Sequence, residues 1–476
     1  MDPIARHATA RPSAPALLTE GDPWSYAALD RAVAHRCGQL RAVGVEPGDR
    51  VGLHAPRSAR LVTLLWALWR LGAVAVPLST RLPPAEVGRA ARRVGCRLLL
   101  SESDAVAEAR PGAVTVRSPG RLPAEGATRG EDRSLDADRP ATILHTSGTT
   151  GTPKAALHTW ANHLYSAKGA NANMPLREGD RWLLTLPLYH VGGLAPLVRC
   201  AIAGAGGVLP CPEQTLAENL RSGAVTYLSL VPTQFRRLLA ATEGAPPSSL
   251  RGVLLGGGPI PSALVRRAQA RGWPILASYG CTEMASQVTT TALGARDSAL
   301  ESAGRRLPHR RLRIDDGEIQ VAGPPLFEGY VTADGVEDPR TGDGWYATGD
   351  RGRIDAAGRL HVLGRIDRMF VSGGENIQPE EIEEVLQQLS GVERAVVVPV
   401  PHPEYGARPV AFVDGSDPGT AEGLSAALAE RLPGFKIPDA FHPLTPHPDS
   451  DGVKVDHEQL ERRARALHSS RGDARE

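Results

Sequence analysis

The chain has 476 residues, of which 41% are hydrophobic and 22% charged, with 54 Lys+Arg against 53 Asp+Glu and a formal net charge of +1. This length exceeds the size at which one hydrophobic core stops growing, so at least two domains are expected and a small binding module is excluded. The balanced charge, without long runs of one sign, gives no reason to expect nucleic acid or an anionic membrane as a partner.

The five cysteines are odd in number and far apart, with no CxxC pair and no metal-ligand spacing. They indicate reduced thiols, and the first residues lack the apolar core of a signal peptide, so a cytoplasmic protein is expected. The longest apolar stretch, residues 61–78, contains Arg70, Gly72 and Pro77. It predicts a buried helix followed by a strand rather than a membrane span. The sequence specifies no oligomeric state.

The first part of the chain alternates helix-length amphipathic stretches with short apolar runs, as in α/β proteins with a largely parallel sheet. Residues 26–43 place apolar side chains on one helix face, and strands are predicted at residues 98–100 and 113–117. Residues 118–140 are rich in proline, glycine and charge, which indicates a surface connection. Residues 253–261 and 274–283 each predict a strand that ends in glycine or small polar residues, where open α/β sheets bind ligands.

After Arg311 the sequence changes to short strands and turns, which predicts a small β-rich subdomain. Helices over residues 379–388 and 421–432, with two strands between them, predict a separate α+β unit. The expected fold is therefore α/β. A large N-terminal domain (1–366) contains α/β subdomains and the β-rich subdomain, and a small α+β C-terminal domain (367–476) follows.

The segment Thr146–Lys154 reads TSGTTGTPK and directly follows the apolar run ATILH. Its hydroxyl groups, glycine backbone and single ammonium suit a polyphosphate, because N–H and O–H donors can wrap the oxygens while lysine supplies charge. The spacing excludes a Walker A loop, which needs four residues between its glycines and a Ser or Thr after the lysine. A Gly/Thr-rich turn is the alternative for this segment taken alone.

Seven motifs in this order resemble the adenylate-forming superfamily of acyl-CoA and aryl-CoA ligases, luciferases and peptide-synthetase adenylation domains. They are TSGTTGTPK, LPLYHVGG (186–193), GGGPIP (256–261), YGCTE (279–283), YATGD (346–350), GRIDRMFVSGGENIQPEEIEEVL (364–386) and DGVKVD (451–456). The resemblance implies that ATP activates a carboxylic acid to an acyl-adenylate and that the acyl group then passes to a thiol. It also implies that the small C-terminal domain rotates between the two steps.

The resemblance assigns the nucleotide site to these motifs. The predicted ATP-binding residues are Thr146, Ser147, Gly148, Thr149, Thr150, Gly151, Lys154, Gly257, Gly258, Pro259, Ser278, Tyr279, Gly280, Thr282, Asp350 and Arg365. Thr282 would contact the α-phosphate, and Asp350, assisted by Arg365, would accept hydrogen bonds from the ribose hydroxyls. Glu283 would bind Mg²⁺, because a hard cation prefers carboxylate oxygen. Outside their motifs, Glu283 and Asp350 would be ordinary loop acids.

The predicted catalytic residues are Lys454, Thr282, His190 and Arg365. Lys454 would bridge carboxylate and phosphate oxygens as charge develops. The superfamily usually has Gly-Lys with an arginine three residues on, whereas here Lys454 follows Val453 and His457 takes the third position. The chain has only four lysines and otherwise uses arginine, which argues against an incidental surface lysine.

The resemblance also assigns the second half-reaction. Asp367 is the predicted hinge about which the C-terminal domain rotates. Rotation would withdraw Lys454 and bring Gly373 and Gly374 to the cleft, where glycine lets the pantetheine arm of CoA approach the backbone closely. His190 would be a movable side chain between the acid pocket and this CoA tunnel. A packed or hydrogen-bonded histidine is the alternative for His190.

Further segments are similar to one branch, the o-succinylbenzoate:CoA ligases of menaquinone biosynthesis. They are KAALHTWANHLYSAKGAN, LVRCAIAGAGGV, SLVPTQFRRLL and SYGCTEMAS. The likeness implies that ATP, Mg²⁺ and coenzyme A act with o-succinylbenzoate to give o-succinylbenzoyl-CoA, AMP and pyrophosphate. This acid has two carboxylates, of which only the aliphatic one is activated. The pocket therefore needs a cation or donors for the other carboxylate.

The predicted acid-binding residues are His190, Gly192, Arg199 and Gly280. Arg199 occupies the position of an arginine in this branch, and a structural ion pair with a nearby acid is its alternative. Gly192 replaces a serine that the branch often has, and the missing hydroxyl favours a second hypothesis, a ligase for another aryl or carboxylic acid. A third hypothesis is a catalytically silent nucleotide-binding relative. Retention of six chemically distinct site residues argues against it: Thr146, Lys154, Glu283, Asp350, Arg365 and Lys454.

Overall fold

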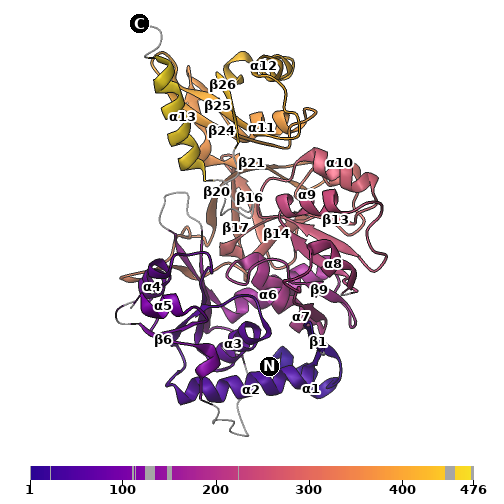
Figure 1. The fold of residues 1–476 in the computed structure, drawn as a ribbon, viewed down its shortest axis with the longest axis vertical. Helices are drawn as coiled ribbons and strands as arrows, with labels where there is room; N and C mark the ends of the chain where they lie inside the picture. The colour runs from indigo at the N-terminus through magenta and orange to yellow at the C-terminus, as the bar shows by residue number, and fades with distance from the viewer. Residues whose placement is uncertain are drawn as a thin grey trace.

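The structure is a computed structural model that describes residues 2–21, 23–109, 112, 114–123, 135–146, 153–222, 224–444 and 456–472. Figure 1 shows the N-terminal helices at one end of the molecule and the C-terminal elements at the other. Some of the predicted site residues lie outside the described residues: Ser147, Gly148, Thr149, Thr150, Gly151 and Lys454.

In the described part of the chain, eight strands form one mixed sheet. Their spatial order is β19 (Gly335–Glu337), β18 (Gly329–Thr332), β8 (Ala155–Thr159), β7 (Pro140–His145), β4 (Val74–Pro77), β3 (Arg50–His54), β5 (Leu98–Ser101) and β6 (Thr115–Arg117). The strands from β7 to β6 are parallel, and β8 then pairs antiparallel with both β7 and β18. The accompanying helices are α3 (Ala59–Arg70), α4 (Pro84–Arg93), α5 (Asp104–Glu108) and the 3-10 turn η1 (Pro119–Arg121).

A second sheet has nine strands among the described residues. Their order is β15 (Arg305–Arg306), β14 (Ser286–Thr290), β13 (Ile275–Cys281), β12 (Gly252–Leu255), β11 (Tyr227–Leu230), β9 (Arg181–Leu183), β10 (Gly206–Val208), β1 (Pro15–Leu18) and β2 (Trp24–Ser25). The strands from β13 to β1 are parallel. The helices of this part are α1 (Pro3–Ala10), α2 (Tyr26–Ala42), α6 (Trp160–Asn173), α7 (Val191–Ala203), α8 (Leu216–Ser222), α9 (Pro232–Ala241) and α10 (Ser262–Ala270).

The apolar stretch at residues 61–78 forms α3 and then β4, as predicted. Ser58 caps α3 by accepting a hydrogen bond from the Leu61 backbone N–H, and Trp66 is fully buried in the core between the two sheets. None of the helices in the described residues combines the length and apolar character that a membrane crossing requires. The strand expected at residues 98–100 is β5, whereas the one expected at 113–117 begins only at Thr115.

The β-rich subdomain predicted after Arg311 is a four-stranded antiparallel sheet of described residues. It consists of β16 (Arg311–Asp315), β17 (Glu318–Ala322), β20 (Tyr346–Ile354) and β21 (Leu360–Arg365). The short 3-10 turn η4 (Ile366–Arg368) follows β21 directly. The domain boundary predicted between residues 366 and 367 therefore falls within this turn.

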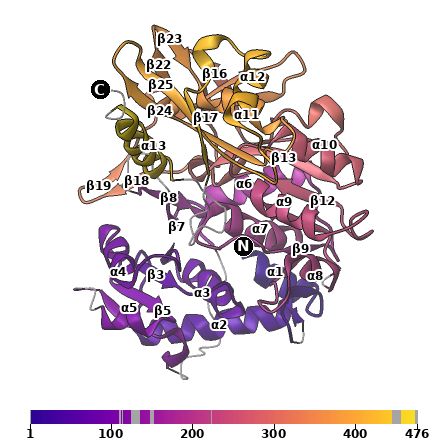
Figure 2. The same cartoon turned by 45° about the horizontal axis from the view of Figure 1, so that its top comes forward.

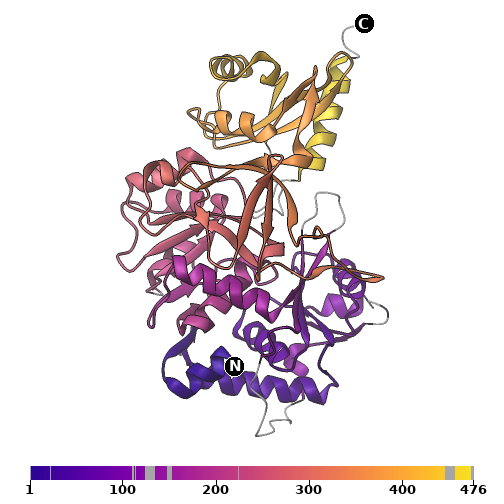
Figure 3. The same ribbon diagram turned by 180° about the vertical axis from the view of Figure 1, so that it is seen from behind.

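The C-terminal part packs helices on both faces of a three-stranded sheet (Figures 1 and 3). Its elements are β22 (Phe370–Ser372), β23 (Glu375–Ile377), α11 (Pro379–Gln387), β24 (Arg394–His402), β25 (Gly406–Asp414), α12 (Ala421–Ala429), β26 (Ala440–Pro443) and α13 (His457–Gly472). Alternate residues of β24 face α11 and α12 on one side and α13 on the other, so both faces are buried. The helix predicted over 421–432 ends earlier, at Ala429, and Pro433, which disfavours helical backbone at Leu432, stops it from extending as far as predicted. Figure 2 shows this part from a second angle, above the two large sheets.

A buried ion cluster ties the N-terminus to α2 and α3. Arg70 Nε donates to Asp2 Oδ2 at 2.7 Å and Arg70 Nη2 donates to Asp30 Oδ1 at 2.9 Å. Arg70→Met would leave both carboxylates buried without this cation, and we expect it to lower the free energy of unfolding by about 3 kcal/mol. Urea titration measures this loss. The exposed Arg340–Asp338 pair supplies the control, since Arg340→Met should cost less than about 1 kcal/mol. Equal losses in the two variants would contradict the assignment.

Candidate active site

The predicted nucleotide residues gather at the carboxyl ends of parallel strands β12 and β13. Ser278 Oγ donates to the Leu255 carbonyl at 2.9 Å, which joins the two strand ends. Gly257 has φ +77°, a conformation that favours glycine, and a side chain at Gly258 would meet open space. Residues 257–259 are exposed. The strand ends thus leave backbone accessible to a ligand.

Asp350 lies where β20 meets β13 and β21. Its carboxylate accepts hydrogen bonds from Tyr279 Oη at 2.6 Å and from Arg365 Nη1 at 3.1 Å. Burial raises the pKa of Asp350, against the opposing effects of the Tyr279 hydrogen bond and the Arg365 charge. Arg365 also donates to Asp367 Oδ2 at 3.0 Å. One guanidinium therefore links the predicted ribose acid to the predicted hinge residue.

Thr282 and Glu283 lie in the 3-10 turn η2 (Thr282–Met284) between β13 and β14. The buried Glu283 accepts a hydrogen bond at Oε1 from Tyr330 Oη at 2.6 Å. Among the described residues no ion pair involves Glu283, so its carboxylate has oxygen donors and uncompensated charge that fit a divalent cation. Lys154 Nζ lies 4.8 Å from the centre of the Tyr330 ring, so the phosphate-loop lysine contacts the tyrosine whose hydroxyl bonds Glu283.

His158 holds the same turn from strand β8. Its Nε2 donates to the Thr282 carbonyl at 2.8 Å, and the side chain is fully buried. This contact requires the neutral tautomer that carries its proton on Nε2 or the doubly protonated ring. Burial lowers the pKa of His158 to about 4, so the ring is neutral at physiological pH.

Because His158 is buried in its neutral form, we expect the free energy of unfolding to fall in acid. Because its pKa is about 4 in the folded protein and 6.5 ordinarily, its contribution is complete above pH 6.5 and declines as the pH falls toward 4. His158→Gln keeps a donor for the Thr282 carbonyl but cannot take up a proton. Between pH 7 and pH 4.5 its free energy of unfolding should therefore fall by about 2 kcal/mol less than that of the parent protein. Thermal melts across this range measure the change. His35→Gln, at an exposed position of α2, is the control, and an equal effect of both variants would refute the prediction.

Arg199, the cation predicted to bind the acid, lies on helix α7. It is 1% exposed, and its guanidinium lies 4.4 Å from the Trp182 ring. Nε donates to Asn171 Oδ1 at 2.9 Å and Nη1 donates to Gln287 Oε1 at 3.1 Å. Nη2 has no hydrogen-bond partner among the described residues. Arg199 is therefore held by amides and a ring, and the expected structural alternative, an ion pair with an acid, is wrong in the described part of the chain.

The other predicted acid-binding residues lie at the start of α7 and near the end of β13. His190 is the N-cap of α7, and Gly192 lies two helical turns before Arg199, on the same face. A methyl group at Gly192 would lie 3.2 Å from Leu186 Cδ1, so the leucine crowds the space that a serine would need. Gly280 pairs with Gln287 across β13 and β14, and a side chain there would meet the Ser286 carbonyl oxygen.

Gly373 and Gly374 form the turn between β22 and β23, with φ angles of +59° and +88°. A methyl group at Gly373 would lie 3.2 Å from the Tyr405 ring, whereas one at Gly374 would meet nothing within 4 Å. Among the described residues no hydrogen bond or ion pair joins this turn to Asp350, Glu283 or Arg199. The part that this turn takes in CoA binding therefore stays a prediction.

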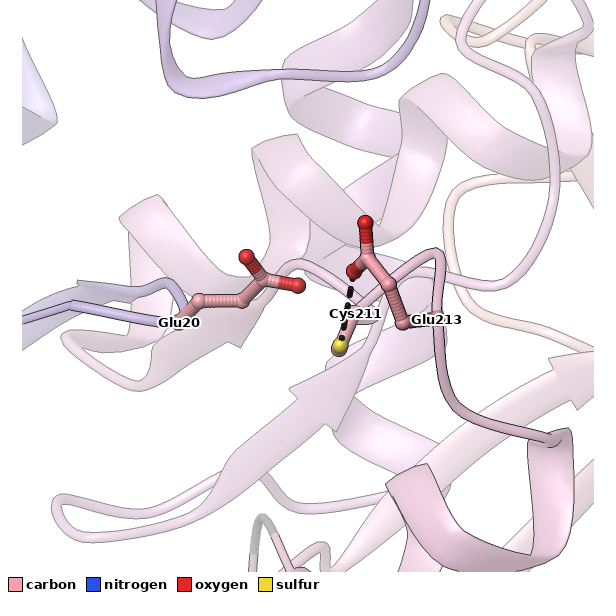
Figure 4. Close-up of side chains that lie close together, drawn as sticks. All are labelled: Glu20, Cys211 and Glu213. Atoms are coloured by element: carbon pink, nitrogen blue, oxygen red, sulfur yellow. Dashed lines mark hydrogen bonds between the residues drawn. The ribbon is translucent and has the colours of Figure 1, made fainter.

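A separate group of potential metal ligands lies on the surface beside β1 and β10. Glu20, Cys211 and Glu213 point toward one another (Figure 4). Cys211 Sγ donates to Glu213 Oε2 at 3.2 Å, and hydrogen bonds to Glu20 and Glu213 raise the pKa of the thiol to about 11. A protonated thiol that donates its one proton to Glu213, with Glu20 nearby, accounts for this cluster without a metal ion.

Some site residues were not anticipated from the sequence. Tyr330 bonds Glu283, His158 bonds Thr282, and Gln287 bonds Arg199. Gln287 lies within four residues of the YGCTE motif, and this proximity could have marked it. Tyr330 lies in an ordinary GYVT strand and His158 in an apolar run, so a single sequence carries no signal for either.

This geometry agrees with comparisons to known proteins. Residues 4–331 match the family model of the AMP-binding enzymes, and residues 381–449 match that of the AMP-binding enzyme C-terminal domain. The chain belongs to the AMP-binding enzyme family. This membership confirms the predicted superfamily, and the α/β fold with its smaller C-terminal part is confirmed as well.

Individual members of the AMP-binding enzyme family are similar over nearly the whole chain. The 2-succinylbenzoate–CoA ligase of Bacillus licheniformis is 36% identical, with 85% of this chain and 87% of that protein covered. The corresponding ligase of Listeria monocytogenes is 32% identical, with coverages of 95% and 97%. The structure of o-succinylbenzoate CoA synthetase from Bacillus subtilis with its acyl-adenylate OSB-AMP superimposes with a TM-score of 0.89 at 33% identity, covering 97% and 98%. The same enzyme with ATP and magnesium ion gives 0.88 at 33% identity, covering 96% and 99%.

Proposed function

We propose that the protein is an AMP-forming acid:CoA ligase for o-succinylbenzoate. With Mg-ATP it forms the acyl-adenylate and releases pyrophosphate, and it then transfers the acyl group to CoA to give o-succinylbenzoyl-CoA and AMP. This reaction belongs to menaquinone biosynthesis. The similarity to 2-succinylbenzoate–CoA ligases over most of the chain supports both the reaction and the acid.

The observation that carries the choice of acid is the state of Arg199. A fully buried guanidinium with one unpartnered N–H group, and no acid paired with it among the described residues, is costly unless a ligand supplies the missing charge. The second carboxylate of o-succinylbenzoate carries a negative charge and can accept hydrogen bonds from a guanidinium. The pocket therefore suits a dicarboxylate with one end bound and the other end reactive.

The remaining residues take the following parts in the proposal. Asp350, held by Tyr279 and Arg365, accepts the ribose hydroxyls, and Thr282 donates to the α-phosphate. Glu283 holds Mg²⁺, which neutralises phosphate oxygens when bound. Lys154 and Lys454 add positive charge as the carboxylate attacks and pyrophosphate leaves.

Transfer to CoA involves the C-terminal domain. We propose a large domain at residues 1–366 and a mobile domain at 367–476 that turns about Asp367. His190 separates the acid pocket from the CoA tunnel, and Gly373 and Gly374 form the tunnel's flexible turn. Use of ATP and CoA, with five free cysteines, favours a cytoplasmic location.

A panel of acids tests the proposal. Pyrophosphate release and CoA-thioester formation would be measured with Mg-ATP and o-succinylbenzoate, benzoate, succinate, a medium-chain fatty acid and hydroxybenzoates. We expect a strong preference for o-succinylbenzoate with a CoA-dependent product. Preference for a different acid would keep the chemistry and discard the substrate. Absence of turnover with every acid would favour a catalytically silent relative.

Gly192 favours a second candidate, a CoA ligase for another aryl acid. Without a hydroxyl at this position the pocket loses one polar contact that the related branch often has. The packing of Leu186 against Gly192 offers an account that keeps o-succinylbenzoate, because the leucine fills the space instead. The acid panel separates the two candidates.

A further inference from the structure

Two buried arginines lie on either side of Gln287 in strand β14. Arg199 and Arg310 are each 1% exposed. Arg199 Nη1 donates to the side-chain Oε1 of Gln287 at 3.1 Å, and Arg310 Nε donates to its backbone carbonyl at 2.8 Å. Gln287 itself is 4% exposed. One residue thus contacts both guanidinium groups in the protein interior.

Neither guanidinium is paired with an acid in the described part of the chain. Arg310 donates its other hydrogen bonds to the carbonyls of Pro308, Ser166 and Tyr165 at 2.9, 3.0 and 3.4 Å, and to Ser166 Oγ at 3.2 Å. Burial lowers the pKa of Arg199 to about 10 and that of Arg310 to about 9, and the charge of Arg199 further lowers the latter. Both groups still carry a proton at neutral pH. The surroundings of Gln287 therefore contain two buried positive charges, and among the described residues these are compensated by dipoles and the Trp182 ring rather than by a carboxylate.

The orientation of the Gln287 amide follows from its neighbours. Thr290 Oγ1 donates to the Thr289 carbonyl at 2.7 Å, so this hydroxyl accepts the hydrogen bond from Gln287 Nε2. The amide oxygen is consequently the atom that faces Arg199. Glutamine at this position fixes the guanidinium while adding no charge. A glutamate of nearly equal size would form an ion pair with Arg199 and neutralise it.

We propose that Gln287 is the positioning residue that makes this pocket selective for dicarboxylic acids. It holds Arg199 in place without neutralising it, and Arg310 adds positive charge behind it. The uncompensated charge is available only to a substrate that brings a second carboxylate. The inference rests on the proposed function and specifies how the site distinguishes o-succinylbenzoate from an acid with a single carboxylate.

The test compares Gln287→Glu, Gln287→Met and the parent protein on two acids. One is o-succinylbenzoate, and the other is 4-oxo-4-phenylbutanoate, the same molecule without the ring carboxylate. For Gln287→Glu we expect KM for o-succinylbenzoate to rise at least about 30-fold while KM for the monocarboxylate stays within about threefold. Gln287→Met keeps the charge of Arg199 but frees its side chain. It should raise KM for o-succinylbenzoate by about tenfold, with kcat for the monocarboxylate retained.

Gln320→Glu is the matched control, because Gln320 Oε1 accepts from Arg313 Nε at 2.9 Å in the β-rich subdomain. This variant should leave the ratio of the two KM values unchanged. Equal losses on both acids in Gln287→Glu and Gln287→Met would assign Gln287 a merely structural role and overturn the inference. An unchanged ratio in Gln287→Glu would also overturn it while leaving the proposed function intact. A parent protein that does not use o-succinylbenzoate would refute the proposed function and the inference with it.

Discussion

Replacing Arg199 with methionine is expected to abolish the preference for o-succinylbenzoate. Methionine has similar length but no charge, so the ring carboxylate would enter an apolar wall without a partner. We expect the ratio of kcat/KM for o-succinylbenzoate to that for 4-oxo-4-phenylbutanoate to fall about 1,000-fold. The monocarboxylate should be used as well as before or better, because its phenyl ring meets a less polar wall. Thioester formation with both acids measures the ratio.

The free energy of unfolding of Arg199→Met distinguishes a substrate-binding arginine from a structural one. Arg199→Met removes an uncompensated buried charge but leaves the amide oxygens of Asn171 and Gln287 without their donor, so we expect it to lower the free energy of unfolding by no more than about 2 kcal/mol. Arg251 provides the contrast: it lies over the Tyr227 ring, and it forms an ion pair with the buried Asp180 at 2.8 Å. Arg251→Met should destabilise the protein, because Asp180 loses its cation. If Arg199→Met lost as much stability as Arg251→Met, the arginine would be part of the scaffold rather than a group reserved for the substrate.

The fold was largely predictable because its elements carry strong local patterns. The apolar stretch around Trp66 could only be a buried helix and strand, and the change of pattern after Arg311 marked the antiparallel subdomain. Helix and strand ends were less accurate. The helix that begins at Ala421 stops before Pro433, and β6 starts two residues late, since local propensity does not fix where packing ends an element.

The site was predictable where its residues share one short motif and unpredictable where strand pairing brings them together. Thr282 and Glu283 are adjacent in the sequence, so a pentapeptide locates both. His158 and Tyr330 contact this turn from 124 and 47 residues away, through β8 and β18. These two strands pair with each other, and no local pattern specifies that pairing.

The partners of Arg199 were likewise not predictable from the sequence. Its position on α7 was evident from the sequence, but its lack of an acidic partner was not, because Asn171 and Gln287 come from distant elements. A structural ion pair and a substrate-binding arginine look identical in a sequence. The three-dimensional arrangement shows no ion pair for Arg199 among the described residues, and its role in binding the acid stays a prediction.

Lys454→Ala is expected to abolish adenylate formation and spare thioester formation. In the proposed mechanism the ammonium of Lys454 meets the developing charge between the attacking carboxylate and the α-phosphate. Removing one such electrostatic contact should slow pyrophosphate release about 1,000-fold. Thioester formation from supplied acyl-adenylate and CoA should change by less than about fivefold, because the C-terminal domain has turned away by then. The two half-reactions are measured separately, by pyrophosphate release and by consumption of synthetic adenylate.

Two other lysines make this result specific. Lys436 forms an ion pair with Glu381 at 2.6 Å on the C-terminal domain, and Lys168 lies 5.3 Å from the Tyr165 ring on α6. Lys436→Ala and Lys168→Ala remove the same charge without reaching the proposed reaction centre, so both half-reactions should persist. Equal losses of both half-reactions in Lys454→Ala would mean that the lysine supports the fold or the binding of both acyl species. A loss confined to the first half-reaction would instead tie Lys454 to the one step in which two anions must approach each other, where an ammonium has the most charge to neutralise.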